Sequence, residues 1–211
     1  MLKSTKTHKK FWSERKINWE QDYLLADGAL NHPHRQMIID TLAKVQFTSV
    51  LEVGMGAGAN LVRIKQQWPA SEVGGFDVNL QAVQTASKFL PQAKFLDVAG
   101  ADDIPLSDRS VDVVLSDACL IYTDPLNIKK TLTEMKRVAR NYLILCEFHS
   151  ESFYDRTKLR IKSGYHAYDY KKVLESLDCY GIHIQKIPKE VWPGTPWEQF
   201  GHIIICTFSS H

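Results

Sequence analysis

The sequence predicts one doubly wound α/β domain with a seven-stranded sheet that is mostly parallel and ends in an antiparallel strand. At 211 residues the chain suits one such domain better than two. After residue 45, short β-rich runs alternate with helical patterns, as they do in βαβ units. The last two runs are joined by KEVWPGTPWEQFG, which is too short for a crossover helix and favours an antiparallel final pair.

Seven runs rich in aliphatic and β-branched residues are expected to form the strands. They are SVLEV (49–53), EVGGFD (72–77), KFLDV (94–98), VDVVLS (111–116), YLILCEF (142–148), IHIQKI (182–187) and HIIICTF (202–208).

Apolar residues at helical spacing predict the helices between these strands. The three stripes are Leu61/Ile64/Trp68, Leu80/Val83/Ser87/Leu90 and Ile128/Leu132/Met135/Ala139. Asp124 as N-cap and Pro125 at the first helical position are expected to start the third helix. The polar segment AGADDIPLSDRS predicts a degenerate crossover between strands three and four. Further helices are expected over 34–45 and 169–178, and a loop without clear periodicity over 147–170.

The first 30 residues are expected to form a basic, aromatic-rich extension or lid on a domain that spans 31–211. Four lysines lie within the first ten residues: Lys3, Lys6, Lys9 and Lys10. Because they exceed the net charge of +2, the remainder is slightly acidic and offers no basic face for a nucleic acid. No apolar run approaches the roughly 20 residues of a membrane span, and no apolar signal-peptide region follows the basic start. Four widely spaced cysteines favour reduced thiols, so a cytoplasmic location is expected.

The stretch LEVGMGAGAN (51–60) follows the first predicted strand and places Gly54, Gly56 and Gly58 in one turn. Such a turn allows a ligand to approach the backbone closely. Because open α/β sheets bind ligands at the carboxyl ends of their strands, Asp77, at the end of strand two, is placed to accept hydrogen bonds from ribose hydroxyls. Gly54, Gly56 and Ala59 also fit the dinucleotide fingerprint, so this loop alone suits NAD and S-adenosylmethionine equally.

Three features favour S-adenosylmethionine. Glu52, two residues before the first glycine, suits an ammonium group and would repel a pyrophosphate. Asp97, at the end of strand three, can accept a hydrogen bond from an adenine amino group while the Val98 N–H donates to the ring. The C-terminus closes in a hairpin where a dehydrogenase would need machinery for its substrate and the hydride.

These motifs resemble those of the class I S-adenosylmethionine-dependent methyltransferases, of the group typified by the type 11 methyltransferase domain. LEVGMGAG resembles motif I, GFDVN motif II, and FLDVAGADDIPLSDRSVDVVLSDACLIY the stretch from the adenine-binding acid through strand four. The resemblance implies a Rossmann-like sheet and S-adenosylmethionine as cofactor. Carried over by position, and with Arg35 added as a partner of the cofactor carboxylate, the cofactor-binding residues are Glu52, Gly54, Gly56, Gly58, Asp77, Val78, Asn79, Asp97, Val98, Ser116 and Arg35.

The acceptor is expected to meet the loops after strands four and five, where Asp117 and His149 are the catalytic candidates. SDACLIYTDP lacks the [DN]-P-P-[YF] motif of amino-methyltransferases that act on nucleic-acid bases, which favours a small-molecule acceptor. A weaker resemblance to methylases associated with pseudaminic acid biosynthesis suggests a sugar or sugar derivative. Tyr154, Arg156, Tyr165 and His166 are candidates for the acceptor pocket, and Trp12, Trp19 and Tyr23 for a lid.

The sequence therefore predicts an S-adenosylmethionine-dependent methyltransferase that acts on a small molecule by in-line transfer. His32 and His34 flank Pro33 and are expected to form a turn, so no metal site is expected. Two alternatives stay open: an NAD-dependent oxidoreductase, and a cofactor-binding partner subunit without catalysis. The sequence leaves the oligomeric state open.

Overall fold

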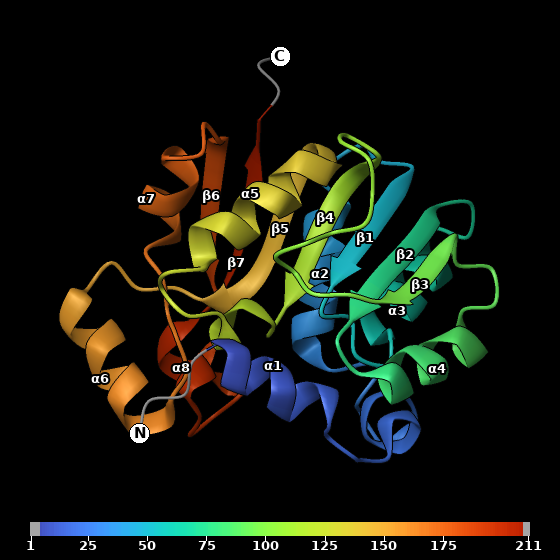
Figure 1. Ribbon diagram of the computed structural model, residues 1–211, viewed down its shortest axis with the longest axis horizontal. Helices are drawn as coiled ribbons and strands as arrows, with labels where there is room; N and C mark the ends of the chain where they lie inside the picture. The colour runs from blue at the N-terminus through green and yellow to red at the C-terminus, as the bar shows by residue number, and fades with distance from the viewer. Residues whose placement is uncertain (1–4, 209–211) are drawn as a thin grey trace.

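A seven-stranded sheet forms the centre of the molecule, with helices on both faces (Figure 1). The computed structural model describes residues 5–208. The strand order is β3-β2-β1-β4-β5-β7-β6; β7 is antiparallel to both of its neighbours, and the other pairs are parallel. The strands are β1 (Ser49–Val53), β2 (Glu72–Asp77), β3 (Phe95–Val98), β4 (Val111–Asp117), β5 (Ala139–Phe148), β6 (Tyr180–Lys186) and β7 (Gly201–Thr207). The predicted fold class is confirmed.

The helices divide between the two faces because successive residues of each strand point to opposite sides of the sheet. Val50, Val113 and Ile144 pack in one core, and their neighbours Leu51, Val114 and Leu143 pack in the other. The first core includes residues of α2 (Pro33–Leu42), α3 (Ala59–Gln67) and α4 (Leu80–Phe89), and the second includes residues of α5 (Ile128–Val138) and α7 (Tyr170–Glu175). Between β3 and β4 residues 99–110 form no helix, as expected.

The remaining helical elements lie near the two ends of the chain or in connecting loops. They are α1 (Thr5–Ser13), α6 (Phe153–Ser163), α8 (Pro196–Phe200), the π-helical turn η1 (Gln21–Leu25), and the 3-10 turns η2 (Leu120–Tyr122) and η3 (Lys189–Val191). Among the described residues, no helix has both the length and the apolar character that a membrane span requires.

The predicted start of α5 was wrong. The helix begins at Ile128 with Asn127 as its N-cap. The Asp124 carboxylate accepts a hydrogen bond from the Leu126 N–H at 3.0 Å and from the Asn127 amide at 3.0 Å. Asp124 therefore closes a turn in front of the helix, since short polar side chains compete with helical hydrogen bonding in this way.

The segment after β5 is not the irregular loop that the sequence predicts, because α6 forms within it. Ser152 caps its start by accepting from the Asp155 N–H at 3.2 Å, and Gly164 ends it in the left-handed conformation with φ of 77°. Only Leu159 of this helix is buried. A helix that buries one side chain carries no apolar stripe, so its caps were the available signal.

The N-terminal segment lies across the edge of the sheet at which β1 and β4 end (Figure 1). The Asn79 amide, at the N-cap of α4, donates to the carbonyl oxygens of Trp12 at 2.7 Å and Arg15 at 2.9 Å. Of the predicted basic residues, Lys9 pairs with Asp102 at 3.8 Å, while Lys3 lies outside the described residues. The lid function of residues 1–30 stays a prediction.

Candidate functional site

A cavity of about 540 Å³ opens at the carboxyl ends of β1, β2 and β4. This volume lies within the roughly 300–1,000 Å³ of small-molecule sites. The glycine loop after β1, the loops after β2, β3 and β4, the start of α2 and the N-terminal segment supply its walls. Among the residues predicted to bind a cofactor or to act in catalysis, those that line it are Arg35, Glu52, Gly54, Gly56, Asp77, Val78 and Asp117.

The loop after β1 reaches this position because glycines adopt backbone angles that other residues avoid. Gly54 has φ of 73°, and a Cβ added to it would lie 2.4 Å from the Sγ of Cys119. Gly56 has φ of 55°, and its N–H donates to Oδ2 of Asp77 at 2.9 Å. Gly58 does not line the cavity; a Cβ there would lie 3.3 Å from the Cβ of Ala86, so it allows α3 to begin close to α4.

Asp77 is fixed at the end of β2 by backbone donors. Its Oδ1 accepts from the Asn79 N–H at 2.8 Å and its Oδ2 from Gly56. Burial raises the pKa of this carboxyl, and the two N–H groups oppose the shift. Because each carboxylate oxygen accepts about two hydrogen bonds, Asp77 retains acceptor capacity toward the cavity.

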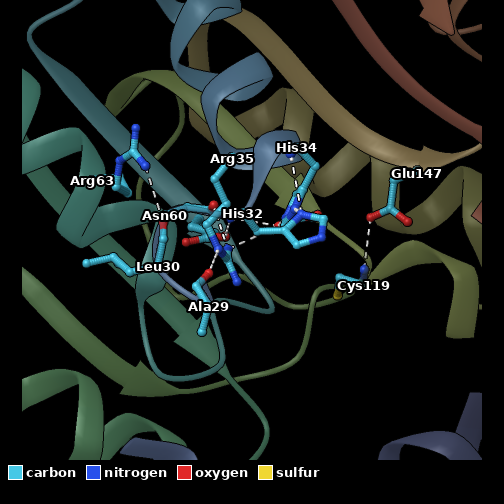
Figure 2. Close-up of polar contacts among 11 residues, drawn as sticks. Ala29, Leu30, His32, His34, Arg35, Asn60, Arg63, Cys119 and Glu147 are labelled. Carbon is cyan, nitrogen blue, oxygen red and sulfur yellow. Dashed lines mark hydrogen bonds and ion pairs between the residues drawn. The ribbon is translucent and has the colours of Figure 1, made fainter. Parts of the chain in front are cut away.

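Asn60, at the start of α3, bonds to three ionisable side chains behind the glycine loop (Figure 2). Its Nδ2 donates to Oε1 of Glu52 at 2.6 Å and to Oδ2 of Asp117 at 3.0 Å. Its Oδ1 accepts from the Arg35 guanidinium at 2.7 Å, and Arg35 also donates to the carbonyl oxygen of Ala29. One amide therefore bridges two buried carboxyl groups and accepts a hydrogen bond from the guanidinium.

The two carboxylates differ in charge because their partners differ. Burial raises the pKa of Glu52 to about 8, although the Asn60 amide opposes the shift. Burial also acts on Asp117, but the His34 ring, Arg35 and Asn60 outweigh it and hold the pKa of this carboxyl well below its usual range. The His34 Nε2 lies 2.9 Å from Oδ2 of Asp117. Each acid keeps one buried oxygen, Oε2 of Glu52 and Oδ1 of Asp117, with no hydrogen-bond partner among residues 5–208.

Glu147 holds the loop after β4 against the cavity. Its Oε1 accepts from the N–H groups of Cys119 and Leu120, both at 3.0 Å, and its Oε2 from that of Ile121 at 3.2 Å. Figure 2 shows the hydrogen bond between Glu147 and Cys119. Burial raises the pKa of Glu147 to about 8 against the pull of these backbone donors. The carboxyl thus fixes η2, which carries Tyr122 into the cavity wall.

Replacing Asn60 by Ala is expected to destabilise the protein by about 2 kcal/mol, because buried groups of Glu52, Asp117 and Arg35 lose a partner at once. Urea unfolding of both proteins measures this difference. The control is Asn127→Ala, which removes an amide that bonds only the turn of Asp124. Equal stability of the Asn60 variant and the wild type would contradict the structural role given to this amide.

Several predicted residues lie elsewhere. Asn79 and Ser116 are buried but do not line the cavity, and Asp97 and Val98 are exposed beside it. His149 lies under α7, where its Nδ1 accepts from the Tyr170 N–H at 3.2 Å and its ring meets that of His202 edge-on. The structure does not bring His149 to the cavity because the chain turns into a bridge with Tyr168 as soon as β5 ends. Its role as a base stays a prediction without support from this placement.

The structure also shows the positions of two residues expected in the acceptor pocket and of the histidine pair. Tyr154 is exposed on α6, and the Arg156 guanidinium donates to backbone carbonyls of 150–151. His32 accepts from the His34 N–H as N-cap of α2 and stacks on Trp192. In residues 5–208 no group of three His, Cys, Asp or Glu side chains is placed to hold a metal ion.

Four features of the cavity were missed from the sequence. Asn60 follows the glycine loop directly, and this position in the sequence could have indicated that it belongs to the site. Asp102, two residues beyond Gly100, supplies the carboxylate on the β3 side of the cavity in place of Asp97. Cys119 and Trp192 also line it, and nothing in their sequence context indicated this. The predicted aromatic residues Trp12, Trp19 and Tyr23 do line the cavity, with the last two stacked at 5.3 Å.

Comparisons with known proteins identify sequences similar to this chain. Residues 50–141 match a family model described as a methyltransferase domain. A malonyl-[acyl-carrier protein] O-methyltransferase of Xylella fastidiosa (strain M23) is 33% identical over 81 residues, which are 36% of this chain and 27% of that protein. The chain thus spans only about a quarter of that relative's length.

Solved structures show the same fold. A chain from the complex between the Trm112 methyltransferase activator and a methyltransferase of Haloferax volcanii has a TM-score of 0.69, with 17% identity over 92% of this chain and 95% of that one. An S-adenosylmethionine-dependent methyltransferase from Thermotoga maritima has a TM-score of 0.64, with 18% identity over 95% of this chain and 98% of that one. The predicted resemblance is confirmed within these limits: residues 50–141 match the methyltransferase domain model, and the fold is the one that these solved methyltransferases share.

Proposed function

We propose that this chain transfers the methyl group of S-adenosylmethionine to a small-molecule acceptor. The observation that carries the proposal is the pair of buried carboxylate oxygens, on Glu52 and Asp117, that have no partner among the described residues and flank the glycine loop. Buried acceptors of this kind call for a donor with several N–H groups and a positive charge. The ammonium group of the cofactor's methionine end meets that requirement, and the pyrophosphate of NAD does not.

The other walls of the cavity suit the rest of the cofactor. Asp77 has acceptor capacity for ribose hydroxyls, and the exposed backbone of Gly54 and Gly56 lets the ligand lie close to the loop. The short side chains of Ala99 and Ala101 leave room on the β3 side, where Asp102 can accept from an adenine amino group. We propose that Arg35, which donates to Asn60, also pairs with the cofactor carboxylate.

The cofactor supplies an activated methyl group, and the chain contributes position and exclusion of water. Trp12, Trp19 and Tyr23 line the cavity and pack in one apolar cluster with Ala57 and Ala59 of the glycine loop. A low-dielectric wall of this kind strengthens the interactions of the buried carboxylates with a bound cation. The site of methyl transfer would lie between Asp117 and Tyr122, where this cavity meets the N-terminal segment.

Titration calorimetry with S-adenosylhomocysteine and with NADH tests the proposal. We expect binding of S-adenosylhomocysteine and none of NADH; the opposite result would favour the oxidoreductase. A screen of cell-extract metabolites with S-adenosylmethionine labelled in its methyl group then identifies the acceptor. Cofactor binding without labelled product would support the non-catalytic partner subunit. A sugar acceptor stays a prediction from the sequence.

Three aspartates give a test of the ribose and adenine sides. Asp77→Ala is expected to weaken S-adenosylhomocysteine binding about tenfold or more, because ribose hydroxyls lose a charged acceptor. Asp102→Ala should weaken it less, about threefold, because this side chain is 43% exposed and paired with lysines. Asp97→Ala serves as control and should stay within about twofold, since Asp97 lies outside the cavity. A larger effect at Asp97 than at Asp102 would restore the assignment made from the sequence.

A further inference from the structure

A second cavity, of about 790 Å³, lies between α1, η2 and the C-terminal end of α6. It shares the lining residues His8, Trp12 and Tyr122 with the first cavity, so the two adjoin. An acceptor has to lie next to the methyl donor, and this cavity adjoins the one in which we place the donor. The inference drawn from it therefore rests on the proposed function.

The second cavity is basic. Arg15, Arg160 and Lys162 line it, and no carboxylate is among its described lining residues. Within residues 5–208 none of these three side chains forms an ion pair, whereas Lys9 pairs with Asp102 at 3.8 Å. The Nε atoms of Arg15 and Arg160 are buried without a hydrogen-bond partner among the described residues. Such groups favour an anion with oxygen acceptors.

The apolar part of the wall indicates the shape of the rest of the ligand. Phe11, Trp12, Tyr122 and Tyr165 line the cavity, and the Tyr122 and Tyr165 rings meet edge-on at 5.6 Å. The Arg15 guanidinium lies over the Trp12 ring, 4.8 Å from its centroid. Aromatic surface with cationic groups at its margin suits a ligand that has an apolar or planar body and one charged end.

One feature of the fold opposes an anion here. The C-terminal end of α6, at Ser163 and Gly164, lines the cavity and carries roughly half a negative charge. Three full positive charges outweigh it. Burial lowers the pKa of the neighbouring His166 to about 4; the charges of Arg160 and His8 add to this shift, and the charge of Asp124 opposes it.

We propose that this second cavity binds the methyl acceptor and that the acceptor carries an anionic group, a phosphate or a carboxylate, held by Arg15, Arg160 and Lys162. Phenyl phosphate and benzoate are suitable probes for the two anions, and benzyl alcohol is a neutral probe of similar shape. Their dissociation constants are measured by calorimetry, with and without saturating S-adenosylhomocysteine.

The variant R160Q/K162Q removes two of the positive charges, and K158Q/K171Q is the matched control. Lys158 lies on the same helix and Lys171 on α7, and neither lines the cavity. We expect R160Q/K162Q to weaken binding of the better anionic probe about tenfold or more, and the control to change it within about twofold. Both variants should bind S-adenosylhomocysteine as the wild type does. The stronger of the two anionic probes identifies the charged group.

Equal effects of the two double variants, or binding of benzyl alcohol as strong as that of both anions, would overturn the proposal. Failure to bind S-adenosylhomocysteine would instead count against the proposed function. In that case the titrations of the three probes into the protein without S-adenosylhomocysteine still decide whether the second cavity prefers an anion.

Discussion

Replacing Glu52 by Gln is expected to weaken S-adenosylhomocysteine binding by about a hundredfold, the largest effect on affinity in this site. Glu52 is buried, and its Oε2 has no partner in the part of the chain that the structure describes. A glutamine of the same shape keeps the contact with Asn60 but offers no negative charge to the ammonium group. Calorimetry of the variant and the wild type measures the loss, and a change of less than about tenfold would contradict the assignment of the methionine end.

The same carboxyl predicts a pH dependence. Because its pKa is about 8 in the free protein, Glu52 is mostly protonated at pH 7. An ammonium group beside it favours the ionised form, so binding should release up to one proton near neutral pH. The affinity of the wild type should therefore rise between pH 6 and 8, and that of Glu52→Gln should not. Calorimetry in buffers with different ionisation enthalpies counts the protons, and release by the variant would exclude Glu52 as their source.

The stability of the free protein should change in the opposite direction. A carboxyl with a raised pKa in the folded state contributes fully below its unfolded value of 4.5, and this contribution is lost as the pH rises through about 8. At pH 9 Glu52 is ionised and buried, whereas Gln carries no charge. Glu52→Gln should therefore melt at a higher temperature than the wild type at pH 9 without ligand, which separates lost function from lost folding.

Gly54→Ala is expected to destabilise the protein by about 3 kcal/mol or more. About 1 kcal/mol comes from the left-handed backbone, since Gly54 has φ of 73°. The remainder comes from overlap, because the new Cβ would lie 2.4 Å from Sγ and 2.7 Å from Cβ of Cys119. Relief requires the loop after β1 to separate from the loop after β4, which would also deform the cavity.

Gly28→Ala separates the cost of the left-handed backbone from the cost of the overlap with Cys119. Gly28 has φ of 76°, close to that of Gly54, but an added Cβ would meet nothing within 4 Å. This control should cost about 1 kcal/mol, the backbone contribution alone. Guanidinium unfolding of both variants gives the comparison. Equal losses would show that Cys119 moves aside without cost and that the two loops are not closely packed.

The sequence by itself determined the sheet and most of the cofactor side. The runs 49–53 and 72–77 became β1 and β2 without a change of boundary, because the interior residues of a strand buried on both faces are mostly apolar or glycine. Gly54, Gly56, Glu52 and Asp77 follow from that frame, since parallel strands end at one edge and their last residues meet there. Local sequence patterns specify the strands and the glycine loop, because these features depend mainly on residues that are close in sequence.

Only the tertiary structure decided which acid stands on the β3 side and where a base can lie. Asp97 lies one residue before the end of β3, but the chain lines the cavity only from Ala99 onward, so that Asp102 supplies the carboxylate there. His149 follows β5 by one residue, but pairing with the segment of Tyr168 turns it away. Arg15 and Arg160 are far apart in sequence and face one cavity because α1 and α6 pack near each other. Contacts between segments that are distant in sequence depend on how whole helices and strands pack. No local pattern of residues specifies that packing.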